Sequence, residues 1–137
     1  MYVENNINMF EEFKKWAVVG ASPKKEKYGY KVFKTLVGRG FTVYPVHVAA
    51  KEIDGFKVYP NINSLPEIPE AVVLIIPPEK TLSVLKDMVK LNIHNVWFQP
   101  GSESEEAIEF CKKNDINFVS KACLMMDVSP ESFRFEI

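Results

Sequence analysis

Short apolar runs that alternate with longer helical patterns are the feature that most constrains the fold of this chain. The runs are mostly apolar and rich in β-branched or aromatic residues, and they occupy residues 16–20, 41–44, 71–76, 96–99 and 116–119. Because each run is nearly continuous rather than alternately polar, it is typical of a strand covered on both faces. We therefore predict a sheet with two buried faces.

Helical patterns fill the spaces between these runs. Apolar residues recur at helical spacing over residues 30–38, 79–91 and 103–114, and a short helix is expected over residues 7–15. Residues 47–70 contain several prolines and no helical stripe, so we expect them to be irregular apart from a short turn at 62–65. Such alternation predicts an α/β fold: a Rossmann-like, doubly wound, mostly parallel five-stranded sheet with helices on both faces.

Composition and charge narrow the class of protein. A chain of 137 residues, 47% of them apolar, is expected to form one domain over residues 1–137. A net charge of −1 argues against a nucleic-acid or acidic-membrane partner. The longest apolar run, residues 71–76, is far short of the roughly 20 residues that span a bilayer. Because the first fifteen residues lack the apolar core of a signal peptide, we expect a cytoplasmic protein without a membrane partner.

Ligands of open parallel sheets bind beyond the carboxyl ends of the strands, where the strand order reverses. After the first strand, Gly20 and the small residues Ala21 and Ser22 let a ligand approach the backbone. The next helix begins near Gly29, and its N-terminus together with Lys24 and Lys25 favours a phosphate. The spacing is not G-x-G-x-x-G, so a tight turn with solvated lysines is the alternative interpretation.

The segment after the second strand distinguishes between nucleotides. NAD-binding domains usually place an acid there to hold the ribose hydroxyls. Here no acid appears before Glu52, whereas His47 and Lys51 would suit a ribose phosphate. This favours a phosphorylated adenosine over NAD, although His47 can also be an ordinary surface histidine.

Chemistry beyond binding has little support in the sequence. No nucleophile elbow, metal-binding helix or Walker A loop is present, so we expect neither catalytic nor metal-ligating residues. Cys111 falls on the apolar stripe of its helix and is expected in the core. Cys123, beside Lys121, is either a reactive thiol or a buried structural cysteine.

Six stretches follow one another in a characteristic order: AVVGAS (17–22), YGYKVFKTL (28–36), GFTVYPVH (40–47), LIIPPE (74–79), VWFQPGSESEEA (96–107) and ACLMM (122–126). Taken together they resemble the stand-alone CoA-binding domain proteins, whose domain is similar to that of the succinyl-CoA synthetase alpha subunit. One departure is that the family often has Asn-Pro after Pro-Val, where this chain has His47-Val48. The resemblance implies a Rossmann-type site for coenzyme A.

The resemblance also implies which residues lie along the cofactor. Those expected at the pyrophosphate are Gly20, Ala21, Ser22, Tyr28, Gly29 and Tyr30, with Lys24 or Lys25 close by. Those expected to border the adenosine are Pro45, Val46, His47, Ile76, Pro77 and Pro78. Those expected along the pantetheine arm are Gln99, Pro100 and Gly101.

The sequence therefore predicts a protein that binds CoA or an acyl-CoA without a complete catalytic apparatus, as a carrier, sensor or accessory protein. One alternative is an NAD(P)-binding enzyme or redox sensor, which the same fold can host. Another is a protein-interaction module with an empty pocket. Near the C-terminus Phe133, Phe135 and Ile137 alternate with polar residues. They predict a tail folded back on its own domain or, alternatively, an edge strand or partner contact.

Overall fold

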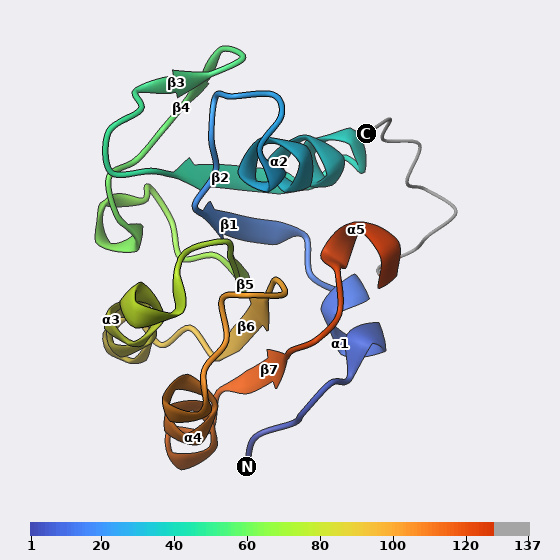
Figure 1. The fold of residues 1–137 in the computed structure, drawn as a ribbon, viewed down its shortest axis with the longest axis vertical. Helices are drawn as coiled ribbons and strands as arrows, with labels where there is room; N and C mark the ends of the chain where they lie inside the picture. The colour runs from blue at the N-terminus through green and yellow to red at the C-terminus, as the bar shows by residue number, and fades with distance from the viewer. Residues whose placement is uncertain (128–137) are drawn as a thin grey trace.

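A parallel sheet forms the centre of the computed structural model, which describes residues 1–127 (Figure 1). Its strands are β1 (Lys15–Val19), β2 (Thr42–Val46), β5 (Ala71–Leu74), β6 (Asn95–Phe98) and β7 (Asn117–Val119). The strand order is β2-β1-β5-β6-β7, and every adjacent pair is parallel. The chain builds outward from β1 to β2, and from β5 in the other direction. The order therefore reverses between β1 and β5.

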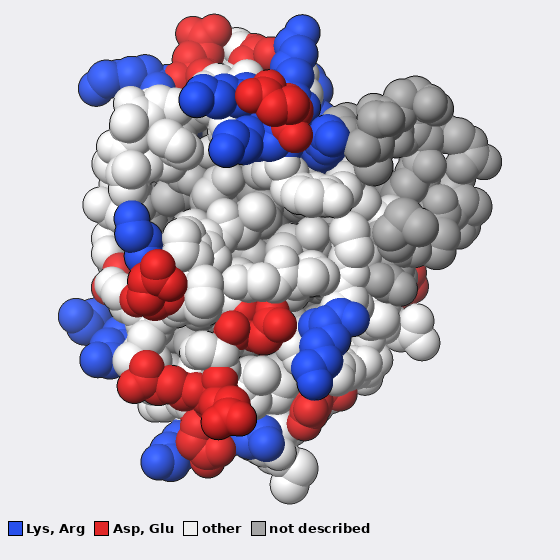
Figure 2. Space-filling model, in the orientation of Figure 1, with Lys and Arg blue, Asp and Glu red and all other residues white. Residues whose placement is uncertain are grey.

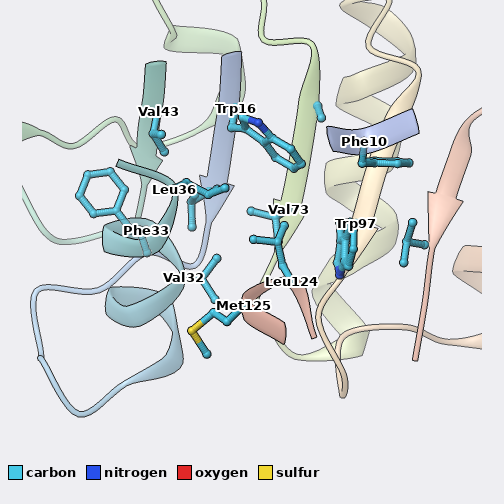
Figure 3. Packing of buried hydrophobic residues seen from close by; sticks show 14 of the residues in the cluster. Phe10, Trp16, Val32, Phe33, Leu36, Val43, Val73, Trp97, Leu124 and Met125 are labelled. Carbon is cyan, nitrogen blue, oxygen red and sulfur yellow. The ribbon is translucent and has the colours of Figure 1, made fainter. Parts of the chain in front are cut away.

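Helices cover both faces of this sheet, which confirms the predicted doubly wound fold. The helices are α1 (Ile7–Glu11), α2 (Tyr28–Gly38), α3 (Pro78–Lys90), α4 (Glu105–Lys113) and α5 (Leu124–Asp127). On one face, Trp16 and Trp97 of the sheet pack in a cluster with Phe10 of α1, Phe33 of α2 and Leu124 of α5 (Figure 3).

The opposite face belongs to α3 and α4. There Ala17 of β1 and Val72 of β5 pack in a second cluster with Leu85 and Met88 of α3 and Cys111 of α4. Because consecutive strand residues point to opposite faces, Trp16 and Ala17 enter different clusters. This accounts for the continuous apolar strands that the sequence shows.

The segment between β2 and β5 is more ordered than the sequence analysis predicts. It contains an antiparallel hairpin of β3 (Glu52–Ile53) and β4 (Phe56–Lys57), followed by the 3₁₀ turn η1 (Ile62–Ser64). The expectation of an irregular segment was wrong for the hairpin and matches the structure at η1. Asp54 and Gly55 form the hairpin turn with φ of +49° and +87°. Asp-Gly is a preferred pair for such turns, so this signal was present in the sequence.

Strand β2 continues through Pro45, where the sequence analysis placed its end. Proline is tolerated because β2 lies at the edge of the sheet. On the side away from β1, the Pro45 carbonyl accepts a hydrogen bond from the Tyr59 N–H at 3.0 Å. The strand therefore reaches Val46 and delivers His47 to the carboxyl edge of the sheet.

Three further expectations concern membranes, metal ions and the C-terminal residues. Within residues 1–127, no helix is long and apolar enough to cross a membrane, and no group of three His, Cys, Asp or Glu residues could hold a metal ion. The expected packing of Phe133, Phe135 and Ile137 lies outside the described residues.

The two cysteines are expected to differ in reactivity. Cys111 is fully buried, and burial raises the pKa of its thiol to about 12, whereas Cys123 is partly exposed. Because the thiolate is the nucleophile, a maleimide or iodoacetamide probe at pH 8 should label Cys123 in the native protein and Cys111 only after unfolding. Intact-mass analysis of the native protein and of Cys123→Ser checks this. Equal labelling of both thiols would contradict the packing described here.

Candidate functional site

A cleft of about 790 Å³ opens at the reversal point between β1 and β5. Its floor is formed by the ends of these strands, at Val19 and Gly20 and at Ile75 and Ile76. The start of α2, the end of β2, η1 and one side of α3 form its walls. Figure 2 shows an uncharged band across the middle of the molecule, with charged side chains gathered above and below it. The position of the cleft at the ends of β1 and β5 agrees with the expectation for an open parallel sheet.

Two glycines allow the backbone segments that form the floor of the cleft to approach one another closely. Gly20 has a φ of +100°, and a Cβ there would overlap the carbonyl oxygen of Ile75. A Cβ on Gly29 would overlap the carbonyl oxygen of Gly20. The ends of β1 and β5 and the first turn of α2 therefore meet backbone against backbone. Hydrogen bonds from Gly20 N to Val46 O (3.0 Å) and from Ile75 N to Val19 O (2.8 Å) fix this junction.

The N-terminus of α2 supplies the positive end of the cleft. Lys27 occupies the N-cap position without a side-chain cap, and Lys27, Tyr28 and Gly29 all line the cleft. The N–H groups of the first turn of a helix have no acceptor within the helix, and the helix dipole favours an anion there. Ser22 holds the preceding loop, because its Oγ accepts a hydrogen bond from Lys24 N at 3.1 Å. This end of the cleft suits a phosphate group.

His47 lies on the wall at the end of β2. Its Nδ1 accepts hydrogen bonds from the N–H groups of Ala49 (3.1 Å) and Ala50 (2.9 Å). In the neutral ring the proton must then be on Nε2, which is left as a donor. Val48, beside it, is 85% exposed and lines the mouth of the cleft.

The remaining walls carry residues that the sequence analysis missed. Pro60, Asn61 and Ile62 come from the turn at η1, within the segment expected to be irregular. From α3 come Glu79, Lys80, Ser83, Val84 and Asp87. The α3 residues follow helical spacing directly after Ile76 and Pro77, so this signal was available in the sequence. For Asn61 the sequence carried no such signal, because its place beside the cleft depends on how the segment between β2 and β5 folds.

The structure brings about half of the predicted site residues into this cleft. They are Gly20, Ser22, Tyr28, Gly29, Val46, His47, Ile76 and Pro77. Pro100 and Gly101 line a second cavity of about 280 Å³, which shares Ile75, Ile76 and Pro77 with the main cleft. The two cavities are therefore neighbours at the ends of β5 and β6.

Other predicted residues lie elsewhere. Ala21 is fully buried in the core beneath α2, Pro45 lies within β2, and Pro78 begins α3. Lys24, Lys25 and Lys51 are exposed and do not line the cleft.

Tyr30 and Gln99 make specific internal contacts instead. The Tyr30 hydroxyl donates to Asp54 at 2.6 Å. Gln99 is buried, and its amide holds the turn after β7: Oε1 accepts from Leu124 N at 2.6 Å, and Nε2 lies 3.6 Å from Cys123 Sγ. The Gln99 side chain thus fixes the turn that follows β7.

Fold and cleft define this chain as an open, doubly wound α/β protein with a cleft at the point where the strand order reverses. The family model described as the CoA binding domain matches residues 14–129. The chain therefore belongs to the CoA-binding domain family, which confirms the resemblance seen in its sequence.

Individual relatives agree with this assignment. The alpha subunit of ADP-forming acetate–CoA ligase II from Pyrococcus furiosus is 27% identical in an alignment of 119 positions, which covers 79% of this chain and 26% of the ligase subunit. A conserved hypothetical protein of P. furiosus has a similar structure, with a TM-score of 0.79 and 38% identity over 83% of this chain and 98% of its own. A hypothetical protein from Pyrococcus horikoshii has a TM-score of 0.85 and 32% identity, covering 89% of this chain and 87% of its own.

The close junction at the floor of the cleft generates a stability prediction. Gly29→Ala should lower the free energy of unfolding by about 1–3 kcal/mol, because the new methyl group must displace the Gly20 backbone. Gly38→Ala, in the same helix, is the matched control, because its Cβ would meet nothing within 4 Å. It should stabilise the protein by roughly 0.5–1 kcal/mol. Urea unfolding of both variants checks this, and equal effects of the two substitutions would contradict the junction.

Proposed function

We propose that this chain binds coenzyme A or an acyl-CoA in the cleft at the carboxyl edge of the sheet. Membership of the CoA-binding domain family supports the ligand, and the geometry of the cleft supports the location. The observation that carries the location is the uncapped start of α2 beside the Gly20–Gly29 junction, where only backbone lies between helix and strand. There a diphosphate can approach the N–H groups of Tyr28 and Gly29.

The walls of the cleft fit the rest of such a ligand. CoA combines charged phosphates with an aromatic base and a long, weakly polar arm. Val46, Ile62, Ile76 and Val84 offer apolar surface for the uncharged parts. Lys27, at the start of α2, adds positive charge near the phosphates, whereas Lys80 is accompanied on α3 by the cleft-lining carboxylates of Glu79 and Asp87. We assign the pantetheine arm to the path from Ile76 and Pro77 toward Pro100 and Gly101, where the second cavity begins.

The proposed role is that of a carrier, sensor or accessory protein. The chain spans 26% of the acetate–CoA ligase subunit that it resembles, so the proposed function does not include the activity of that ligase. Within the cleft, the Nδ1 atom of His47 is occupied by two backbone donors, which makes the ring a hydrogen-bond donor rather than a base toward a ligand. This arrangement favours binding over proton abstraction.

The ligand carried by the purified protein tests the proposed function. Protein purified from its expression host is heat-denatured, and the released small molecules are identified by ultraviolet absorbance and mass spectrometry. We expect CoA or an acyl-CoA. Release of NAD or NADP would instead support the dinucleotide alternative. Protein with no released nucleotide and no CoA binding on titration would support the interaction-module alternative.

The ribose phosphate of CoA should contribute to affinity through His47. A hydrogen bond to a charged group contributes roughly 1.5–3 kcal/mol, so CoA should bind at least about tenfold tighter than dephospho-CoA, and NAD should bind weakest. His47→Ala should reduce the preference for CoA over dephospho-CoA, whereas Lys51→Ala is the control, because Lys51 is exposed and lies outside the cleft lining. Calorimetric titration at two salt concentrations measures these affinities. An unchanged preference in His47→Ala would remove His47 from the phosphate site.

A further inference from the structure

One continuous segment leaves the cleft wall and returns to it. We call residues 47–62 the strap. It begins at His47, passes through the β3–β4 hairpin, and re-enters the wall at Asn61 and Ile62. Its two arms are joined beside the sheet, where His47 N donates to Tyr59 O at 3.0 Å. Farther out, Val58 N donates to Lys51 O, also at 3.0 Å. A displacement of the hairpin should therefore move both His47 and Asn61.

Helix α2 holds the far end of the strap through a carboxylate and an aromatic contact. Asp54, at the tip of the hairpin, accepts a hydrogen bond from the Tyr30 hydroxyl at 2.6 Å and pairs with Lys34 Nζ at 3.0 Å. Phe33 lies between them in sequence and meets Phe56 of the hairpin edge-on, with ring centroids 5.2 Å apart. The Tyr30 hydroxyl and the Lys34 ammonium lower the pKa of Asp54, so the carboxylate stays charged in the neutral range.

The same helix thus carries two features of the cleft. Its first turn forms the anion site, and Tyr30 at the end of that turn, together with Lys34 one turn later, holds the strap. Because an α-helix is rigid over this length, the contacts of α2 with Asp54 and with the apolar side chains of the hairpin relate the position of the strap wall to that of the anion site.

We propose that Tyr30, Lys34 and Asp54 are positioning residues, which fix the wall of His47 and Asn61 relative to the anion site and thereby set the affinity for the ligand. The proposal rests on the proposed function for its ligand, CoA. It assigns Tyr30 a role through Asp54, in place of the direct contact with the pyrophosphate that the family resemblance implies.

The chain offers a matched control with the same chemistry. Tyr44 donates to Glu67, and Lys15 pairs with Glu67 at 2.8 Å, so a second tyrosine–carboxylate–lysine cluster holds the later part of the same crossover. None of these three residues lines the cleft. Tyr44 also meets Tyr59 of the strap edge-on, with ring centroids 6.1 Å apart, and Tyr44→Phe keeps that ring contact. Removing the polar cluster should therefore loosen the crossover without moving the strap wall.

The experiment compares Asp54→Asn and Tyr30→Phe/Asp54→Asn with Glu67→Gln and Tyr44→Phe/Glu67→Gln. Asparagine tolerates the left-handed backbone of residue 54, where φ is +49°, so the turn should survive. The Tyr30→Phe/Asp54→Asn variant should raise the Kd for CoA about fivefold, with a smaller increase for Asp54→Asn, because the contact is partly exposed. Both control variants should stay within about twofold of the original protein.

Amide hydrogen exchange without ligand gives a second readout, which does not depend on CoA binding. The N–H groups of His47 and Val58, both bonded within the strap, should exchange faster in the Tyr30 and Asp54 variants than in the controls. If exchange in the strap is unchanged, the positioning role is refuted, whatever happens to the affinity. Faster exchange with unchanged CoA affinity would also refute it. A native chain that does not bind CoA at all would refute the proposed function, while the exchange result would still decide whether these residues hold the strap.

Discussion

The backbone junction between β1, β5 and α2 is the constraint on which the rest of the molecule depends. Gly20 and Gly29 lack the side chains that would separate these elements, so the helix begins directly above the ends of the two central strands. Since the strand order reverses at this place, the neighbouring connections turn away from each other and leave a cleft. The free end of α2 then faces that cleft, and the position of the proposed anion site follows from packing alone.

The segments that form the other walls of the cleft lie farther along the chain. Helix α3 begins immediately after Ile76 and Pro77, so its cleft side is placed by the end of β5. The crossover between β2 and β5 is instead held by side chains, with Asp54 bound to α2 and Glu67 bound to Tyr44 and Lys15. The cleft thus combines a floor made by the backbone with a wall that is held by the buried side chains of Ile53, Val58 and Ile62 and by partly exposed polar contacts.

These differences explain how much the sequence could predict. The strands and main helices were predictable because each buries continuous or regularly spaced apolar residues, and Gly20, Gly29 and His47 followed from their places at strand and helix ends. The hairpin was missed although Asp54-Gly55 signalled it. Asn61 in the wall, and the internal contacts of Tyr30 and Gln99, depend on tertiary packing between segments far apart in sequence. No local pattern specifies such contacts.

The most direct test of this account is a titration of the ¹⁵N-labelled protein with CoA, followed by the backbone amide resonances. The largest shifts should occur at the amides of Gly20, Tyr28, Gly29 and His47 and at those of Asn61, Ile62, Ile75 and Ile76, which surround the cleft. The amide resonances of α4, which does not line the cleft, should stay unchanged. Largest shifts on α4, or saturation with CoA that leaves the amides of Gly20 and Gly29 unmoved, would contradict it.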